Sequence, residues 1–210
     1  GARTLPDELT ALSISVPVVA LAGTCMDSGK TAAACAIVTR LRANGLRVAA
    51  CKVTGVSLRR DVLAMEDAGA FTSQLFSDFG VMTTTAGNGP ALTRALLAAL
   101  ADEQPDVIVV ELGDGLLGTY GVDAILADDD IRKAMTSVVL CANDPVAAWG
   151  GVRILRETYE IEPSVVTGPS TDNAVGINLI EEKMGVTARN ALTQGVALGD
   201  HVFNSIRKTG

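Results

Sequence analysis

The sequence has few of the residues on which many catalytic and metal-binding sites depend. Its 210 residues include one histidine, His201, and four cysteines without the short pair spacing of zinc sites or redox disulfides. We therefore expect neither a zinc centre nor a histidine-based catalytic triad. Cys25, Cys35, Cys51 and Cys141 are instead expected to be free, mostly buried thiols of a cytoplasmic protein.

Long apolar runs, aromatic residues and excess positive charge are also scarce. No stretch approaches the length of a membrane span, and no signal peptide is recognisable. The formal net charge of −7 argues against nucleic-acid or polybasic membrane partners. Aromatic residues make up only 3% of a chain that is 48% hydrophobic and has 21 glycines. A core of Ala, Val, Leu and Ile is therefore expected, which suits a parallel sheet covered by closely packed helices.

The most informative stretch is a loop that ends in Gly-Lys-Thr. A buried strand is predicted before it, at 16–22, and a helix after it, at 31–43. This order predicts a phosphate-binding loop, because glycines let backbone N–H groups turn inward and a helix N-terminus adds partial positive charge. Lys30 is predicted to reach the terminal phosphates and Thr31 to ligate Mg²⁺. The expected nucleotide contacts are Gly23, Thr24, Cys25, Met26, Asp27, Ser28, Gly29, Lys30, Thr31 and Ala32.

The rest of the chain alternates between strand and helix patterns. This alternation predicts an α/β fold, a doubly wound and mainly parallel sheet with helices on both faces, as in the three-layer sandwich of P-loop NTPases. Further strands are expected at 46–53, 106–111, 137–141 and 164–167, and further helices at 61–70, 90–102, 145–158 and 173–184. Residues 128–130 are expected to cap another helix, before the strand at 137. A loop is expected at 78–90 and a turn at 113–115. Residues 1–15 are interpreted as an N-terminal tail and 16–210 as a single nucleotide-binding domain, within which 185–210 give no readable pattern.

Charged residues follow two of the predicted strands. Glu111 ends one of them and can hold Mg²⁺ or its water, with Asp114 as a second metal contact or a catalytic group that binds substrate. Lys52 ends another, where its ammonium can neutralise developing charge. The structural alternatives are that Glu111 caps a helix, that Asp114 is a turn residue and that Lys52 extends into solvent.

Two further features leave alternatives open. Asp27 lies inside the phosphate-binding loop, where it faces either Mg²⁺ and substrate or solvent. Asn143, Thr167 and Pro169 follow later strands, where a nucleotide base would be bound in this architecture. Asp144, which precedes a proline, is at least as well explained as a helix cap.

The motifs resemble a known superfamily. The loop GTCMDSGKT is similar to the GTDTGVGKT-type loop of dethiobiotin synthetase and cobyrinic acid amide synthase nucleotide domains, within the SIMIBI class of P-loop proteins. Lys52-Val53 looks like their Lys-Pro-Val, and the segment from Glu111 to Gly118 like their Glu-Gly-Ala-Gly-Gly. Cys25 stands where the loop aspartate of dethiobiotin synthetase would be.

Four other short sequence segments resemble those of an uncharacterised group of P-loop proteins that carry a domain of unknown function. They are Lys52-Val-Thr-Gly55, Asp67-Ala-Gly-Ala70, Asp114-Gly-Leu-Leu117 and Gly150-Gly-Val-Arg-Ile-Leu155. In that group the domain commonly follows an N-terminal domain, which here would lie outside the chain, and some members are associated with N-acylation of amino acids.

Three functions follow as expectations. The first is an enzyme that uses ATP and Mg²⁺ to activate or phosphorylate a small carboxylate or amine, as a ligase or phosphotransferase. The second is an acyltransferase that holds coenzyme A in the same loop, and the third is a non-catalytic nucleotide-binding regulatory domain. The resemblance also implies a homodimer.

Overall fold

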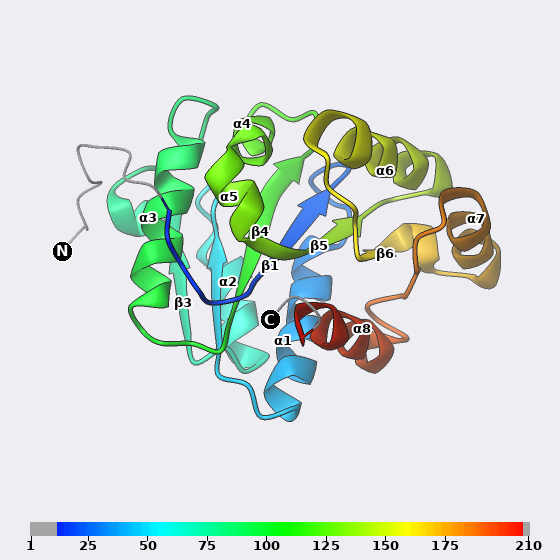
Figure 1. Ribbon diagram of the computed structural model, residues 1–210, viewed down its shortest axis with the longest axis horizontal. Coiled ribbons are helices and arrows are strands. Elements are labelled where there is room, and N and C mark those ends of the chain that lie inside the picture. The colour runs from blue at the N-terminus through cyan, green and yellow to red at the C-terminus, as the bar shows by residue number, and fades with distance from the viewer. Residues whose placement is uncertain (1–11, 208–210) are drawn as a thin grey trace.

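A single six-stranded parallel sheet forms the centre of the computed structural model, which describes residues 12–207 (Figure 1). The strand order is β3-β2-β4-β1-β5-β6. Every pairing between neighbouring strands is parallel, so the carboxyl ends of all six strands lie at one edge. The strands are β1 (Val18–Gly23), β2 (Val48–Lys52), β3 (Thr72–Leu75), β4 (Val107–Gly115), β5 (Met135–Cys141) and β6 (Val165–Thr167).

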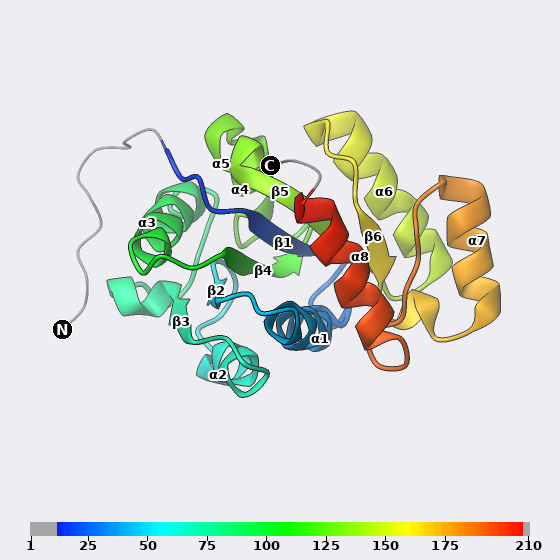
Figure 2. The same ribbon diagram turned by 60° about the horizontal axis from the view of Figure 1, so that its bottom comes forward.

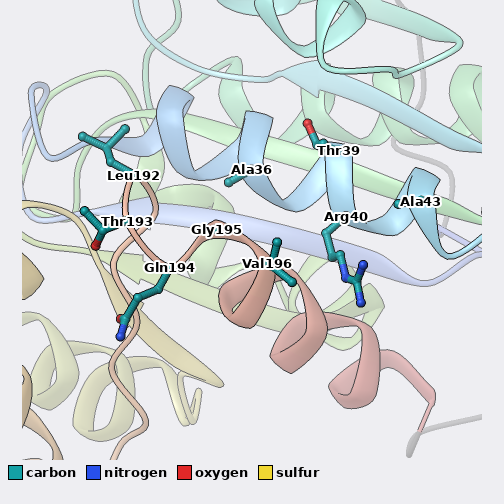
Figure 3. A pocket seen from close by; sticks show the side chains of 9 residues that line it. All are labelled: Ala36, Thr39, Arg40, Ala43, Leu192, Thr193, Gln194, Gly195 and Val196. Atoms are coloured by element: carbon teal, nitrogen blue, oxygen red, sulfur yellow. The ribbon is translucent and has the colours of Figure 1, made fainter.

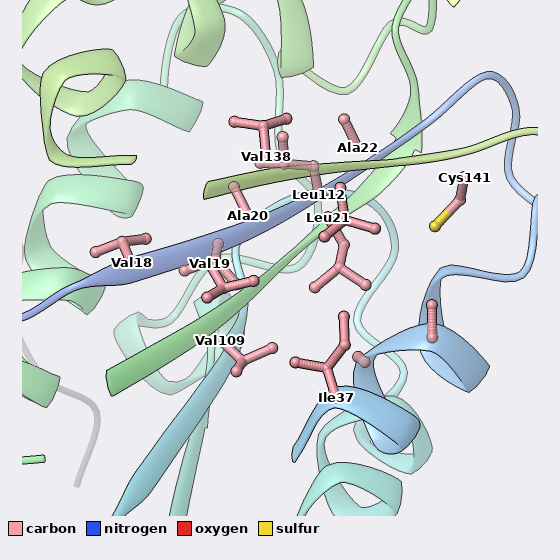
Figure 4. Packing of buried hydrophobic residues seen from close by; sticks show 14 of the residues in the cluster. Val18, Val19, Ala20, Leu21, Ala22, Ile37, Val109, Leu112, Val138 and Cys141 are labelled. Atoms are coloured by element: carbon pink, nitrogen blue, oxygen red, sulfur yellow. The ribbon is translucent and has the colours of Figure 1, made fainter. Parts of the chain in front are cut away.

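The central strand β1 is buried on both faces. Its sequence, VVALAG, is a continuous apolar run rather than an alternating one, as expected of a parallel strand covered by helices on both sides. Figure 4 shows its side chains packed between those of neighbouring strands and of helix α1, with Ile37 and Val109 on one side and Val138 on the other. This packing fixes the end of β1, and therefore the start of the phosphate-binding loop.

Helices cover both faces of the sheet and complete a three-layer arrangement (Figure 2). Helices α1, α2 and α8 lie on one face, α3 to α6 lie on the other, and α7 packs against α6. Their bounds are α1 (Lys30–Ala43), α2 (Arg59–Asp67), α3 (Gly89–Ala101), α4 (Val122–Ala127), α5 (Asp129–Ala134), α6 (Pro145–Tyr159), α7 (Ala174–Met184) and α8 (Gly195–Arg207). Two short 3₁₀ helices, η1 (Phe76–Phe79) and η2 (Pro169–Thr171), follow β3 and β6. Within residues 12–207, no helix has the length and apolar character needed to cross a membrane.

The predicted fold class is confirmed, and most predicted elements lie where the sequence placed them. Three predictions were incomplete: β3 and α4 were not recognised, and α8 occupies part of the segment that gave no readable pattern. The turn predicted at 113–115 was wrong, because β4 continues through these residues and pairs with β1 at Gly115. The predicted tail at 1–15 lies mostly outside the described residues.

Candidate functional site

The sheet register brings the predicted site residues to one edge. Lys52 of β2 lies opposite Glu111 of β4, and Glu111 in turn lies opposite Leu21 of β1. On the other side of β1, Gly23 lies opposite Cys141 of β5, which lies opposite Thr167 of β6. Residues that are far apart in sequence therefore surround the end of β1, where open α/β sheets bind their ligands.

The loop after β1 folds around the Lys30 ammonium. Lys30 Nζ donates hydrogen bonds to the carbonyl oxygen of Cys25 at 2.7 Å, to that of Met26 at 3.2 Å, and to Ser28 Oγ at 3.3 Å. Gly29 has a φ of +86°, a left-handed conformation that glycine adopts easily, and it precedes the first turn of α1. A Cβ atom at Gly23 would overlap Ser28 Oγ and Lys30 Nζ, so a larger residue there would force these two side chains to shift.

Burial sets the electrostatics of the loop lysine. The Lys30 side chain is buried, and its pKa is lowered from the ordinary value chiefly by desolvation. Nearby acidic groups, including Glu111 and Asp114, oppose this effect and favour the charged form. A polyanionic ligand at the loop would add to that stabilisation, because phosphate oxygens accept hydrogen bonds from an ammonium group.

Thr31 contacts the carboxylate at the end of the apolar part of β4. Its hydroxyl Oγ1 lies 3.1 Å from Glu111 Oε2 and 3.3 Å from Oε1, to which it donates. Glu111 is almost fully buried, and burial raises the pKa of its carboxyl group. Lys52, Lys30 and the hydrogen bond from Thr31 lower that pKa in part, whereas Asp61 raises it further.

The Thr31 hydroxyl and the Glu111 carboxylate suit a magnesium ion that also binds phosphate oxygens, rather than a metal ion held by protein side chains alone. Across residues 12–207, no three His, Cys, Asp or Glu side chains gather closely enough to hold a metal ion. Mg²⁺ usually keeps several waters and takes one or two protein ligands together with phosphate oxygens. Thr31 and Glu111 fit this pattern, so the ion would arrive with the nucleotide.

Lys52 forms a buried ion pair with Asp61, a residue that the sequence analysis did not single out. Lys52 Nζ donates to Asp61 Oδ2, and the two side chains are 6% and 11% exposed. Asp61 lies in the first turn of α2, and its other oxygen lies 3.6 Å from Nε of Arg60. The sequence does contain a signal for this pair, because Asp61 is an acidic residue in the first turn of the helix that follows β2, the strand ending at Lys52.

Asp114 is buried at the end of β4. Its Oδ2 accepts a hydrogen bond from the Tyr120 backbone N–H at 3.4 Å, and its carboxylate lies so close to Gly118 that a Cβ there would overlap it. A metal contact or a catalytic role for Asp114 stays a prediction.

The opposite side of the loop contains the residues predicted to bind a base. Asn143 is exposed, whereas Asp144 caps α6, because its Oδ1 accepts the N–H groups of Val146 and Ala147 at 2.8 Å each. Thr167 is fully buried, and its hydroxyl has no hydrogen-bond partner within the described part of the chain. The same holds for the buried hydroxyl of Thr24.

The segment after β6 packs directly on the phosphate-binding loop. Gly168 has a φ of +93°, and a Cβ there would overlap the Ser28 carbonyl oxygen and lie 2.8 Å from that of Ala142. Pro169, which follows it, is exposed, and its Cδ would lie 3.6 Å from a Cβ at Gly29. Of the remaining loop residues, Met26 and Asp27 are exposed, Cys25 is half-buried and Ala32 is exposed at the start of α1.

A cavity of about 460 Å³ lies elsewhere, between α1 and the segment that leads into α8 (Figure 3). Its lining consists of Ala36, Thr39, Arg40, Ala43 and residues 192–196. None of the predicted site residues borders this cavity, which is therefore separate from the candidate site.

Comparisons with known proteins show the fold and not the family. No protein-family model and no curated protein matches the sequence. The signal recognition particle receptor FtsY from Elizabethkingia anophelis in complex with GDP is similar in structure, with a TM-score of 0.61 and 15% identity over 91% of this chain and 65% of that one. A duf1611 family protein from Anabaena variabilis has a TM-score of 0.63 and 13% identity over 99% of this chain and 63% of that one. Hydrogenase maturation factor HypB from Archaeoglobus fulgidus has a TM-score of 0.56 and 13% identity over 91% and 90%.

These similarities show an α/β fold of the P-loop NTPase type for this chain. Membership of the SIMIBI class stays a prediction. The chain spans about two thirds or less of the length of the FtsY and duf1611 proteins. The closer resemblance to dethiobiotin synthetase stays a prediction.

Proposed function

We propose that this chain is part of a magnesium-dependent enzyme that uses ATP to phosphorylate or activate a small carboxylate or amine. The contact between Thr31 and Glu111, directly beside the loop that holds Lys30, supports this proposal most strongly. A loop that only bound phosphate would need Lys30 and the backbone N–H groups. A hydroxyl and a buried carboxylate at the neighbouring position add the ligands that a magnesium–nucleotide complex requires.

Each group has a defined role in this proposal. Lys30 and the loop N–H groups bind the phosphates and stabilise the charge on the phosphoryl group during transfer. Thr31 and Glu111 would hold Mg²⁺, which neutralises phosphate charge when bound. Lys52 lies on the same edge, and an anionic substrate that reaches the terminal phosphate would share the Lys52 ammonium with Asp61.

For a carboxylate substrate, the transfer balances without an additional base. A substrate oxygen forms a bond to the γ-phosphorus as the bond to the oxygen bridging the β- and γ-phosphates breaks. ADP leaves with that electron pair, and the product is an acyl phosphate, which a nucleophile can then attack.

Asn143 supports adenine as the base. A carboxamide can donate to and accept from the N7 and N6 edge of adenine in a bidentate pair. The carboxylate of Asp144 would suit the N–H groups of guanine, but its Oδ1 already accepts two N–H groups of α6.

The test is formation of ADP from ATP and Mg²⁺ in the presence of a panel of small carboxylates and amines. We expect at least one substrate to accelerate ADP formation, and Lys30→Ala to abolish it. Lys183→Ala is the matched control, because Lys183 is exposed on α7, away from the site. The proposal is wrong if Lys30→Ala binds and uses ATP as the parent does.

A further inference from the structure

The strand pairing places the carboxylate of Glu111 on the residue opposite Lys52. The two residues lie directly opposite each other in the parallel pairing of β2 and β4. The Lys52 side chain also packs along β4, since a Cβ at Gly113 would lie 2.6 Å from Lys52 Cε. The ammonium group is close enough to Glu111 that its charge lowers the pKa of the Glu111 carboxyl group.

The ion pair that Lys52 forms is nevertheless with Asp61. This pair is buried on both sides and joins the end of β2 to the first turn of α2. Arg60 also lies near Asp61, but the Arg60 side chain is 81% exposed and contacts the other carboxylate oxygen at 3.6 Å. Lys52 is therefore the buried cation that Asp61 neutralises.

The consequence for Glu111 is that its oxygens contact the Thr31 hydroxyl and, within residues 12–207, form no ion pair. Both Glu111 oxygens lie within 3.3 Å of the Thr31 hydroxyl. An unpaired ammonium in a buried site is costly, so a Lys52 side chain without Asp61 would turn to the carboxylate that lies opposite it in the strand pairing, which is Glu111. An ion pair between Lys52 and Glu111 would then compete with Mg²⁺ for the same oxygens.

We propose that Asp61 is a positioning residue that holds Lys52 away from Glu111 and so keeps the Glu111 carboxylate available to Mg²⁺. This inference rests on the proposed function, because it assumes that Glu111 serves a magnesium–nucleotide complex. Asp61 acts through Lys52, and the proposal gives it no contact with the metal or the nucleotide. Its effect should therefore disappear when Lys52 is removed.

The test measures how strongly Mg²⁺ tightens nucleotide binding. A non-hydrolysable ATP analogue is titrated by calorimetry in Mg²⁺ and in EDTA, and the ratio of the two dissociation constants is the magnesium effect. For Asp61→Asn we expect the magnesium effect to fall about tenfold, the size of one charge-assisted contact. For the double variant, Lys52→Met with Asp61→Asn, we expect the magnesium effect to return to within about twofold of the parent value. A twofold change corresponds to less free energy than one charge-assisted contact.

A control variant on α2 and a second comparison among the Lys52 and Asp61 variants complete the test. Asp67→Asn removes an exposed carboxylate from α2 and should leave the magnesium effect unchanged. Asp61→Asn leaves a buried lysine unpaired. If this variant fails to fold, the comparison of Lys52→Met with the double variant decides. The proposal requires these two proteins to have the same magnesium effect.

Two results would overturn the proposal. One is a parent-like magnesium effect in folded Asp61→Asn. The other is a double variant whose magnesium effect stays below that of Lys52→Met, which would mean that Asp61 acts on the metal directly. Failure of the proposed magnesium–nucleotide site is distinct, because the parent itself would then show no magnesium effect, and failure of the enzyme activity is measured separately by ADP formation.

Discussion

The hydroxyl of Thr31 lies 3.1 Å from Glu111 Oε2, although the two residues are 80 positions apart in the sequence. This contact joins the first turn of α1 to the central strand β4 across the end of β1. It combines a magnesium-type ligand from the phosphate-binding loop with a buried carboxylate from the sheet. Several properties of the site depend on this pair.

Thr31→Val should separate magnesium binding from phosphate binding. Valine has nearly the same shape as threonine but cannot ligate Mg²⁺ or donate to Glu111. We expect ATP to bind this variant in EDTA about as tightly as it binds the parent, while the tightening by Mg²⁺ falls about tenfold, the equivalent of 1.4 kcal/mol. Calorimetry under both conditions makes the measurement, and Thr31→Ser, which keeps the hydroxyl, should retain most of the magnesium effect. A parent-like response of the valine variant would exclude Thr31 as a ligand.

Glu111→Gln should raise thermal stability in a pH-dependent way. Burial raises the pKa of the Glu111 carboxyl group above its value in the unfolded chain, so the folded state binds a proton more readily than the unfolded state. The penalty of the buried charge is therefore complete above the raised pKa and is relieved as the pH falls through it. We expect the variant to melt about 2–4 °C above the parent at alkaline pH, corresponding to about 1 kcal/mol, with a smaller gap at lower pH. Differential scanning calorimetry over a pH series checks this, and a variant that melts below the parent throughout would contradict it.

Two glycines should respond to alanine in opposite directions. Gly168 has a φ of +93° and no room for a Cβ between the Ser28 and Ala142 carbonyl groups, so Gly168→Ala should cost at least about 1–2 kcal/mol. Gly150 lies inside α6, and a Cβ there would meet nothing within 4 Å, so Gly150→Ala should stabilise the protein by about 0.8–1.0 kcal/mol. Urea unfolding measures both changes. Because Gly168 packs on the phosphate-binding loop, its variant should also bind ATP more weakly. Equal effects of the two substitutions would contradict this account of the loop.

Asn143 and Asp144 are adjacent, but we expect their substitutions to have different effects. Asp144→Ala removes the cap of α6 and should lower the free energy of unfolding by about 1 kcal/mol with little change in base preference. Asn143→Ala should leave stability unchanged and weaken ATP binding about three- to tenfold, the value of one hydrogen bond. Unfolding and nucleotide titrations on both variants separate the two roles. If Asn143→Ala has no effect on ATP affinity, Asn143 does not bind the base.

The elements around the phosphate-binding loop were predictable because their signals are local. The apolar run of β1, the Gly-Lys-Thr sequence and the helical pattern of α1 are adjacent in the sequence. Asn44 and Gly45 also mark the end of that helix, where Gly45 has a φ of +87°. The position of Lys52 at the end of β2 followed from the same pattern.

The features that were missed depend on contacts between distant segments. β3 has the polar sequence TSQL and is a strand because β2 supplies its hydrogen bonds. The extension of β4 through Gly113 and Gly115 contradicts the turn preference of glycine, since pairing with β1 outweighs local propensity. α8 packs chiefly against α1, and Gly199 permits that approach because a Cβ there would overlap the Arg40 side chain. The ion pair between Lys52 and Asp61 likewise arises only when α2 docks on the sheet.

A calorimetric titration of the protein with ATP and Mg²⁺, ATP and EDTA, and acetyl-CoA tests the central claim most directly. The account predicts that ATP binds, that Mg²⁺ tightens its binding through Thr31 and Glu111, and that acetyl-CoA binds weakly or not at all. Binding of acetyl-CoA without binding of ATP would contradict the account and would indicate acyl transfer from coenzyme A.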